Sequence, residues 1–187
     1  MIEEVKKALE VLKQGGVILY PTDTIWGLGC DATNADAVRR IYKIKKRAET
    51  KSMLVLIDNA VKLQTYVSEV PEMAWDLIEL TSKSLTIIYP GARNLAENLI
   101  PEDKTIGIRV TEEAFSKKLC ERFRKPIVST SANVSGEKSP LIFAEISEEI
   151  ISQVDYVVNF RQNENIPAQA SSIIKLGLGN VVEVIRM

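Results

Sequence analysis

No histidine occurs anywhere in this chain of 187 residues. Histidine is the commonest general base in enzymes, a member of the Ser-His-Asp and Cys-His catalytic triads, and a frequent metal ligand. Its absence excludes those triads and every metal site that depends on histidine. Any catalysis must therefore use lysine and arginine charge, hydroxyls, carboxylates, backbone amides or a metal ion brought in from outside the chain.

Cysteine and long apolar runs are scarce as well. The two cysteines, Cys30 and Cys120, stand far apart, which disfavours a disulfide or zinc framework and favours thiols in or near the core. No apolar stretch approaches membrane-spanning length, and the N-terminus has the pattern of an amphipathic helix with acidic residues instead of a signal peptide. We expect a cytoplasmic protein with no membrane partner.

Excess charge of either sign is also missing. With 24 basic and 25 acidic residues the net charge is −1, so no global electrostatic attraction to nucleic acid is expected, although a local basic patch is compatible with it. The hydrophobic and charged fractions, 45% and 26%, are those of an ordinary globular protein. The length suits a single domain over residues 1–187 that buries a substantial core.

Strand and helix patterns alternate along most of the chain, which predicts an α/β fold. Apolar runs predict strands at 17–20, 53–57, 85–89, 105–110, 127–128 and 156–158, and a terminal β-hairpin formed by 171–176 and 181–185. Helical spacing and cap residues predict helices at 2–12, from Asn34 or Asp36 to 44, from 58, and at 71–80, 112–124 (capped by Thr111) and 143–154. The hairpin favours a mixed sheet over a purely parallel one. Gly27-Leu28-Gly29 and Gly177-Leu178-Gly179 lack the spacing of a dinucleotide-binding motif and are interpreted as turns.

A basic segment follows the second predicted helix and contains Lys45, Arg47 and Lys51. Arginine offers a planar fork, and lysine a point charge, for phosphate or carboxylate, so the segment could clamp an anion. Cations at a helix C-terminus also interact favourably with the helix dipole. For a charge run taken alone, a solvated helix end is the more usual interpretation, and this segment by itself is a weak signal for a site.

Residues 129–136 form a second polar stretch, Ser-Thr-Ser-Ala-Asn-Val-Ser-Gly, directly after a predicted strand. Such a segment could form a nest of backbone donors around a phosphate, or it could be a simple Ser/Asn-rich turn. It matches neither a Walker loop nor a Gly-x-Ser-x-Gly elbow. Its local sequence leaves both interpretations open.

Thr105 and Arg109 are four residues apart on a predicted strand and so share one face of it. An arginine inside an apolar strand needs a ligand or an ionic partner, because burying an unpaired charge is costly. A structural salt bridge would satisfy it as well as a ligand would. Trp26 could stack on a base, but a core position is the simpler interpretation.

Five segments, taken in order, resemble the YrdC-like threonylcarbamoyl-AMP synthases. The resemblance covers nearly the whole chain and rests on Val-Ile-Leu-Tyr-Pro-Thr-Asp-Thr-Ile-Trp-Gly-Leu (17–28), Ile-Tyr-Lys-Ile-Lys-Lys-Arg (41–47), Thr-Ile-Gly-Ile-Arg-Val (105–110), Ser-Ala-Asn-Val-Ser-Gly (131–136) and Ala-Ser-Ser-Ile-Ile (170–174). It implies a twisted mixed sheet with helices on both sides, enclosing a deep, positively charged cavity.

The resemblance also implies an activity. Members join L-threonine, bicarbonate or CO2, and ATP into threonylcarbamoyl-AMP and release pyrophosphate. Partner proteins then transfer the threonylcarbamoyl group to an adenosine beside the tRNA anticodon. Mg²⁺ is expected on the ATP phosphates, with no metal site formed by the protein.

Site residues are carried over by position in the matching segments. By resemblance, Lys45 and Arg47 are catalytic; Thr24, Arg109 and Ser171 contact threonine; and ATP is contacted by Arg47, Lys51, Thr105, Ser131, Asn133 and Arg186. The chain departs from the family pattern at Lys51-Ser52-Met53, at Leu56, where some relatives have a histidine, and at Ser82-Lys83-Ser84, where a Pro-Gly-Pro turn is common.

Two other functions remain to be separated from this one. The same cavity could belong to a module that recognises double-stranded RNA or tRNA by shape. It could also belong to a carbamoyl-adenylate-forming enzyme similar to the YrdC-like domain of hydrogenase-maturation proteins, which are larger multidomain chains.

Overall fold

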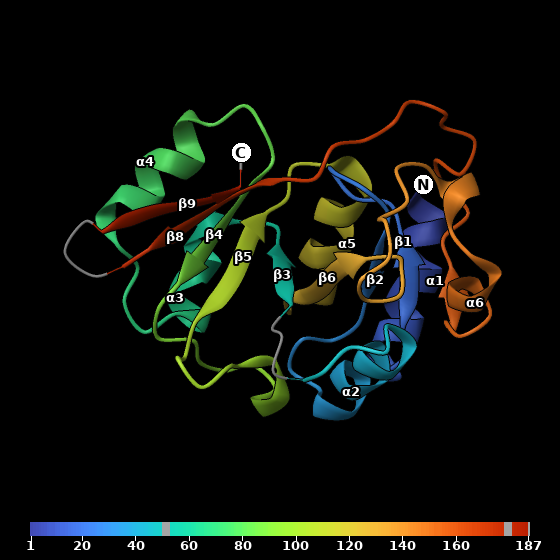
Figure 1. The fold of residues 1–187 in the computed structure, drawn as a ribbon, viewed down its shortest axis with the longest axis horizontal. Coiled ribbons are helices and arrows are strands. Elements are labelled where there is room, and N and C mark those ends of the chain that lie inside the picture. The colour runs from blue at the N-terminus through green and yellow to red at the C-terminus, as the bar shows by residue number, and fades with distance from the viewer. Residues whose placement is uncertain (50–52, 178–180, 187) are drawn as a thin grey trace.

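The computed structural model describes residues 1–49, 53–177 and 181–186. Within them, one mixed sheet has the strand order β7-β1-β2-β6-β3-β5-β4-β8-β9 (Figure 1). The strands are β1 (Ile18–Tyr20), β2 (Gly27–Gly29), β3 (Leu54–Ile57), β4 (Leu85–Tyr89), β5 (Ile106–Val110), β6 (Ile127–Ser131), β7 (Tyr156–Val157), β8 (Ser172–Leu176) and β9 (Val182–Arg186). The α-helices are α1 (Ile2–Lys13), α2 (Ala35–Ile44), α3 (Leu63–Tyr66), α4 (Glu72–Leu80), α5 (Ala114–Phe123) and α6 (Glu148–Ile151), with 3-10 turns η1 (Ala60–Lys62), η2 (Glu97–Leu99) and η3 (Phe143–Glu145).

The sheet contains both parallel and antiparallel pairs, which confirms the predicted mixed α/β class. β3 runs parallel to β5 and β4 runs parallel to β8. The pairs β2–β6, β3–β6, β4–β5 and β8–β9 are antiparallel. The β8–β9 pair is the predicted terminal hairpin, although positions 178–180 of its turn lie outside the described residues.

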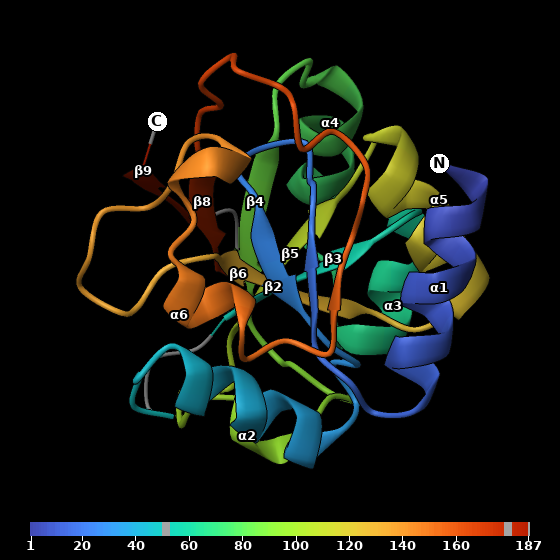
Figure 2. The ribbon, with the colours of Figure 1, turned by 90° about the vertical axis from the view of Figure 1, so that its right-hand side faces the viewer.

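Helices cover both faces of the sheet. Alternate residues of a strand point to opposite faces, and in β1 Ile18 joins one core cluster while Leu19 joins the other. The first cluster packs α1 and α5 against the sheet, and these two helices lie together in Figure 2. The second cluster contains the buried faces of α2 and α4. Burial of these two apolar faces is the main source of the stability that holds the sheet.

The short segment Gly27–Gly29 was predicted as a turn and is instead strand β2, inside the sheet between β1 and β6. Glycine fits this position because a Cβ on Gly29 would stand 2.6 Å from Cε1 of Tyr20 and 3.0 Å from the carbonyl oxygen of Val128. The glycines therefore permit close packing between strands, a use of glycine that short-range spacing does not distinguish from a turn.

Other boundaries also differ from the prediction. β6 extends to Ser131, so the polar stretch begins inside the sheet instead of in a loop. The predicted helix 143–154 is two short turns, η3 and α6, separated by the buried and extended Ile146. Asn34 caps α2 by accepting from the amides of residues 36 and 37. Glu113, instead of Thr111, caps α5 by accepting from the amide of Ser116.

No helix in the described parts of the chain is both long enough and apolar enough to cross a membrane.

Candidate functional site

A cavity of about 300 Å³ opens on the strands β2, β6, β3, β5, β4, β8 and β9. Seven of the predicted site residues line it: Thr24, Arg47, Thr105, Arg109, Ser131, Ser171 and Arg186. They come from segments far apart in the sequence, and the strand order brings them together. Apolar side chains of Leu54, Ile88 and Ile173 line another part of the wall.

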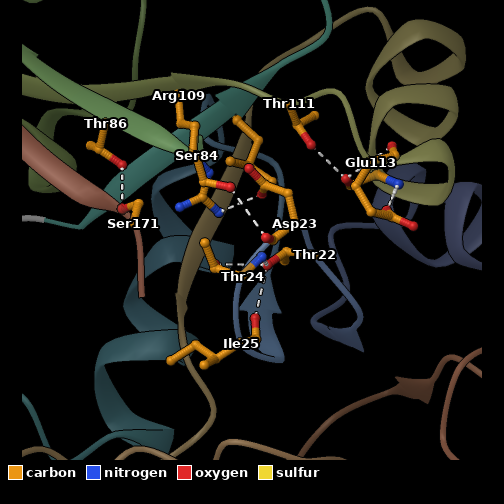
Figure 3. Close-up of polar contacts among 12 residues, drawn as sticks. Thr22, Asp23, Thr24, Ile25, Ser84, Thr86, Arg109, Thr111, Glu113 and Ser171 are labelled. Atoms are coloured by element: carbon orange, nitrogen blue, oxygen red, sulfur yellow. Dashed lines mark hydrogen bonds and ion pairs between the residues drawn. The ribbon is translucent and has the colours of Figure 1, made fainter. Parts of the chain in front are cut away.

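The loop between β1 and β2 is held in shape by its own hydroxyls. Thr22 Oγ1 donates to the carbonyl oxygen of Ile25 at 2.8 Å and accepts from the backbone amide of Thr24 at 3.0 Å. The hydroxyls of Thr22 and Thr24 lie 3.0 Å apart (Figure 3). Ser84 Oγ also donates to the carbonyl oxygen of Asp23 at 3.1 Å. Thr24 is thereby fixed at the cavity wall, and Ser84 supplies a hydroxyl that fastens this loop.

Arg109 is buried on β5, with 3% of its side chain exposed, and its Nη2 lies 3.1 Å from Oδ1 of Asp23. Burial lowers the pKa of Arg109, the charge of Asp23 opposes this shift, and the charge of Arg186 adds to the lowering. Within the described structure Nε of Arg109 has no hydrogen-bond partner. The structural ion pair exists, and one donor of the same guanidinium is unused. Both interpretations left open by the sequence therefore remain compatible with Arg109.

Lys45 lies behind the cavity wall. Its side chain is buried, and Nζ donates to the carbonyl oxygens of Ser131 and Asn133 at 2.5 and 2.7 Å. The backbone amide of Ser135 donates in turn to the carbonyl oxygen of Lys45 at 2.8 Å. Burial, and secondarily the charge of Arg47, lower the pKa of Lys45 to about 8. Lys45 joins the end of α2 to the polar stretch after β6, and this geometry shows no contact between Lys45 and the cavity.

Asn133 also lies outside the cavity lining. Its Nδ2 donates to the carbonyl oxygens of Val134 and Glu137, both at 2.9 Å. Its Oδ1 is buried and has no hydrogen-bond partner in the part of the chain that the structure describes. The structure therefore does not bring Asn133 to the cavity surface, and Lys51 lies outside the described residues.

The end of the chain closes the cavity beside Ser171. Arg186 donates from Nε and Nη2 to the carbonyl oxygen of Ser171 at 2.9 and 2.7 Å. Thr86 Oγ1 and Ser171 Oγ lie 2.9 Å apart (Figure 3). Thr86 also lines the cavity, and the sequence analysis missed it. The available signal was a single threonine within the apolar run of 85–89.

Leu56 is fully buried in the cluster of α1 and α5 and does not line the cavity. Leu54, two residues earlier on the same strand, is at the cavity wall.

The donor set of the cavity does not suit a metal held by the protein. Its lining includes eight hydroxyl side chains, of Thr24, Thr86, Thr105, Ser129, Thr130, Ser131, Ser139 and Ser171, and no carboxylate. Among the described residues, no group of three or more cysteine or acidic side chains is arranged to hold a metal ion. Carboxylates and phosphate oxygens are the usual ligands of Mg²⁺.

Residues 10–187 match the profile of the Sua5/YciO/YrdC family, which carries the description "Telomere recombination". This chain belongs to that family. A relative named threonylcarbamoyl-AMP synthase from Pseudoalteromonas translucida (strain TAC 125) is 39% identical over 155 residues, covering 81% of this chain and 83% of that protein. A protein of the same name from Vibrio cholerae (strain O395) is 31% identical over 161 residues, covering 84% and 86%.

Solved structures share the fold. E. coli YciO is 26% identical, with a TM-score of 0.85 over 100% of this chain and 89% of that one. P. abyssi Sua5, solved in complex with L-threonine, is 24% identical, with a TM-score of 0.84 over 95% of this chain. The aligned part is 52% of the P. abyssi chain, so this chain spans about half of that protein's length.

Proposed function

We propose that this protein is an L-threonylcarbamoyladenylate synthase, which forms threonylcarbamoyl-AMP and pyrophosphate from L-threonine, bicarbonate or CO2, and ATP. The observation that carries the proposal is the single cavity in which Arg47, Arg109 and Arg186 meet a lining rich in hydroxyls. Family membership and the names of the relatives support the same activity. The binding of L-threonine to P. abyssi Sua5, which has the same fold, supports the amino-acid substrate.

In this proposal the cavity holds two anions that must be brought together. The guanidinium of Arg109 binds the threonine carboxylate, with Thr24 and Ser171 as neighbouring hydroxyls. Arg47 and Arg186 offset the charge of the triphosphate, and Thr105 and Ser131 contact the nucleotide. Lys45, together with the segment that contains Asn133, shapes the nucleotide side of the cavity from behind. Lys51 remains a proposed ATP contact by resemblance alone.

The chemistry proceeds in two steps. The amine of threonine attacks the carbon of bicarbonate or CO2 and becomes a carbamate; water leaves when bicarbonate is the source. A carbamate oxygen then attacks the α-phosphorus of ATP, the bond from that phosphorus to the bridging oxygen breaks, and pyrophosphate leaves. Such transfers are catalysed by positioning and by neutralising charge. A chain without histidine can therefore carry them.

Mg²⁺ is proposed as a companion of ATP. When bound, such an ion neutralises phosphate charge. Because the described lining contains no carboxylate, the ion would be held by phosphate oxygens, and we assign it no protein ligand. Transfer of the product to tRNA by partner proteins, in the cytoplasm, completes the proposed role.

Omission of single substrates tests the proposal. Purified protein with ATP, bicarbonate and L-threonine should release pyrophosphate, and omission of threonine or bicarbonate should abolish the release. Carbamoyl phosphate in place of threonine and bicarbonate tests a carbamoyl-adenylate enzyme, of the kind suggested by the fold similarity to HypF (23% identity, TM-score 0.83). Release with carbamoyl phosphate alone, or salt-sensitive RNA binding without any nucleotide turnover, would contradict the proposal.

A further inference from the structure

Thr86 and Ser171 form a buried hydroxyl pair at the cavity wall. Thr86 is on β4 and 2% exposed, Ser171 precedes β8 and is 3% exposed, and their Oγ atoms are 2.9 Å apart. The parallel pairing of β4 with β8 sets this distance, because Leu85 and Thr86 lie opposite Ser172 and Ile173. Both hydroxyls line the cavity.

The protons of this pair can be counted. Two hydroxyls carry two protons, and one proton forms the bond between them. Within the described part of the chain, the other hydrogen-bond contact of Ser171 Oγ is with Nη2 of Arg186 at 3.5 Å. An arginine can only donate, so it cannot accept the proton of Ser171. Among the described residues, the side chain of Thr86 has no hydrogen-bond partner other than Ser171. One hydroxyl proton therefore remains without an acceptor among the residues that the structure describes.

The direction of the bond decides where that proton points. If Ser171 donates to Thr86, the remaining proton belongs to a threonine that is 2% exposed. If Thr86 donates to Ser171, the remaining proton belongs to Ser171, beside the guanidinium of Arg186 and in the cavity that Arg109 also lines. A buried donor without an acceptor is energetically unfavourable. An anionic ligand held between two guanidiniums is the acceptor that removes this cost.

We propose that Thr86 is a positioning residue that orients Ser171 as a hydrogen-bond donor to the carboxylate of the amino-acid substrate. Thr86 donates to Ser171, and Ser171 donates to the carboxylate. This inference rests on the proposed function and adds a residue to its threonine side. It also fixes the direction of the hydrogen bond between the two hydroxyls. Ser171 Oγ then favours a ligand that accepts a hydrogen bond over one that donates.

Thr86→Val tests the proposal, because valine keeps the branched shape and removes only the hydroxyl. We expect KM for L-threonine to rise about tenfold, and KM for ATP to change less than about twofold, since the effect is confined to one hydrogen-bonded donor. Thr86→Ser restores the hydroxyl and should return KM for threonine to within about twofold of wild type. In the double variant with Ser171→Ala, the Thr86→Val change should add less than about twofold, because the group that it orients is gone.

Thr111→Val is the matched control. Thr111 and Ser116 form another fully buried hydroxyl pair, 2.7 Å apart, at the start of α5 and outside the cavity lining. Loss of that hydroxyl removes the same kind of bond without touching the site. It should lower the melting temperature while leaving KM for threonine unchanged.

Four results would overturn the inference. An unchanged or lower KM for threonine in Thr86→Val would show that Ser171 donates to Thr86. An equal rise in the KM values of both substrates would indicate a general distortion of the cavity. If Thr86→Val does not fold, Thr86→Ser provides the test. A tenfold rise in KM for L-threonine in Thr86→Ser would show that the shape of the threonine side chain, and not its hydroxyl, causes the effect. Wild-type protein that releases no pyrophosphate in the same assay removes the proposed function and this inference with it.

Discussion

Oδ1 of Asp23 lies 3.1 Å from Nη2 of Arg109, with 14% and 3% of the two side chains exposed. This pair joins the loop after β1 to the middle of β5, across three strands of the sheet. The carboxylate neutralises the guanidinium in the free protein and leaves Nε of Arg109 without a partner among the described atoms. The ion pair thereby compensates a buried positive charge in the free protein.

Asp23→Asn should lower the free energy of unfolding by about 3 kcal/mol, because it leaves the buried charge of Arg109 without compensation. Urea denaturation of both proteins measures the difference. Asp36→Asn is the control: Asp36 pairs with Arg39 on the surface, with 90% of its side chain exposed, and should change stability by less than about 1 kcal/mol. Equal losses in the two variants would mean that the Asp23–Arg109 pair has no special structural role.

Arg47→Ala should lower the rate of threonine-dependent pyrophosphate release by about 100-fold or more, because a cation that stabilises transferring phosphate charge is removed. Circular dichroism should show an unchanged fold, since Arg47 follows α2 instead of packing within it. Arg39→Ala, on the exposed face of the same helix, serves as the control. Retained activity in Arg47→Ala would remove this residue from the site.

Lys45 gives a dependence of stability on pH with a defined sign. Its folded-state pKa of about 8 is below the ordinary value of 10.5, so between these values the unfolded chain binds more protons than the folded one. Wild-type stability relative to Lys45→Met should therefore rise between about pH 8 and pH 10.5. Urea denaturation at pH 7.5, 9 and 10.5 measures this slope.

Lys46, the neighbouring lysine, gives a pH dependence of stability with the opposite sign. A hydrogen bond with Glu149 raises the pKa of the exposed Lys46. Its contribution is therefore present at neutral pH and is lost as the pH rises through the raised value. Wild type compared with Lys46→Met should show only a small slope, downward with pH, because the pair is exposed. If the difference in stability between wild type and Lys45→Met does not change with pH, Lys45 is solvated and does not hold the 131–133 turn.

Gly29→Ala should destabilise the fold by about 2 kcal/mol, the usual effect of overpacking. The new Cβ would stand 2.6 Å from the ring of Tyr20, which is itself completely buried. Gly27→Ala is milder, because the nearest atom would be Ser129 Oγ at 3.3 Å. Thermal melting that ranks Gly27→Ala as the more damaging change would contradict the packing given for β2.

The sequence predicted most elements because their periodicity and caps are local. The helix 72–80, the strands at 54–57 and 85–89 and the terminal hairpin follow from apolar spacing and from single residues such as Asn34. Strand β2 could not be predicted in the same way. Its Gly29 is required by close packing against Tyr20 and Val128, which approach it only in the folded sheet. The same holds for the end of β6, whose polar residues pair with β2 and β3.

Part of the cavity lining could also be predicted. Motif resemblance located Thr24, Arg109 and Ser171, which line one cavity, but it could not show that Lys45 points to backbone carbonyls. The direction of a side chain at the end of a helix depends on what packs there. Lys45 contacts Ser131, the last residue of β6, which lies 86 residues further along the chain. Thr86 was missed because its importance comes from a strand pairing with β8, which lies far along the chain.

The most direct measurement follows the carbon atom of bicarbonate. Purified wild-type protein is incubated with ATP, L-threonine and ¹³C-labelled bicarbonate. The nucleotide products are then separated, and their masses are measured by mass spectrometry. The account predicts threonylcarbamoyl-AMP that carries one ¹³C atom, in amounts equal to the pyrophosphate released. ADP with inorganic phosphate, or an adenylate of threonine without the labelled carbon, would contradict the claim that this cavity joins a carbamate to the α-phosphate of ATP.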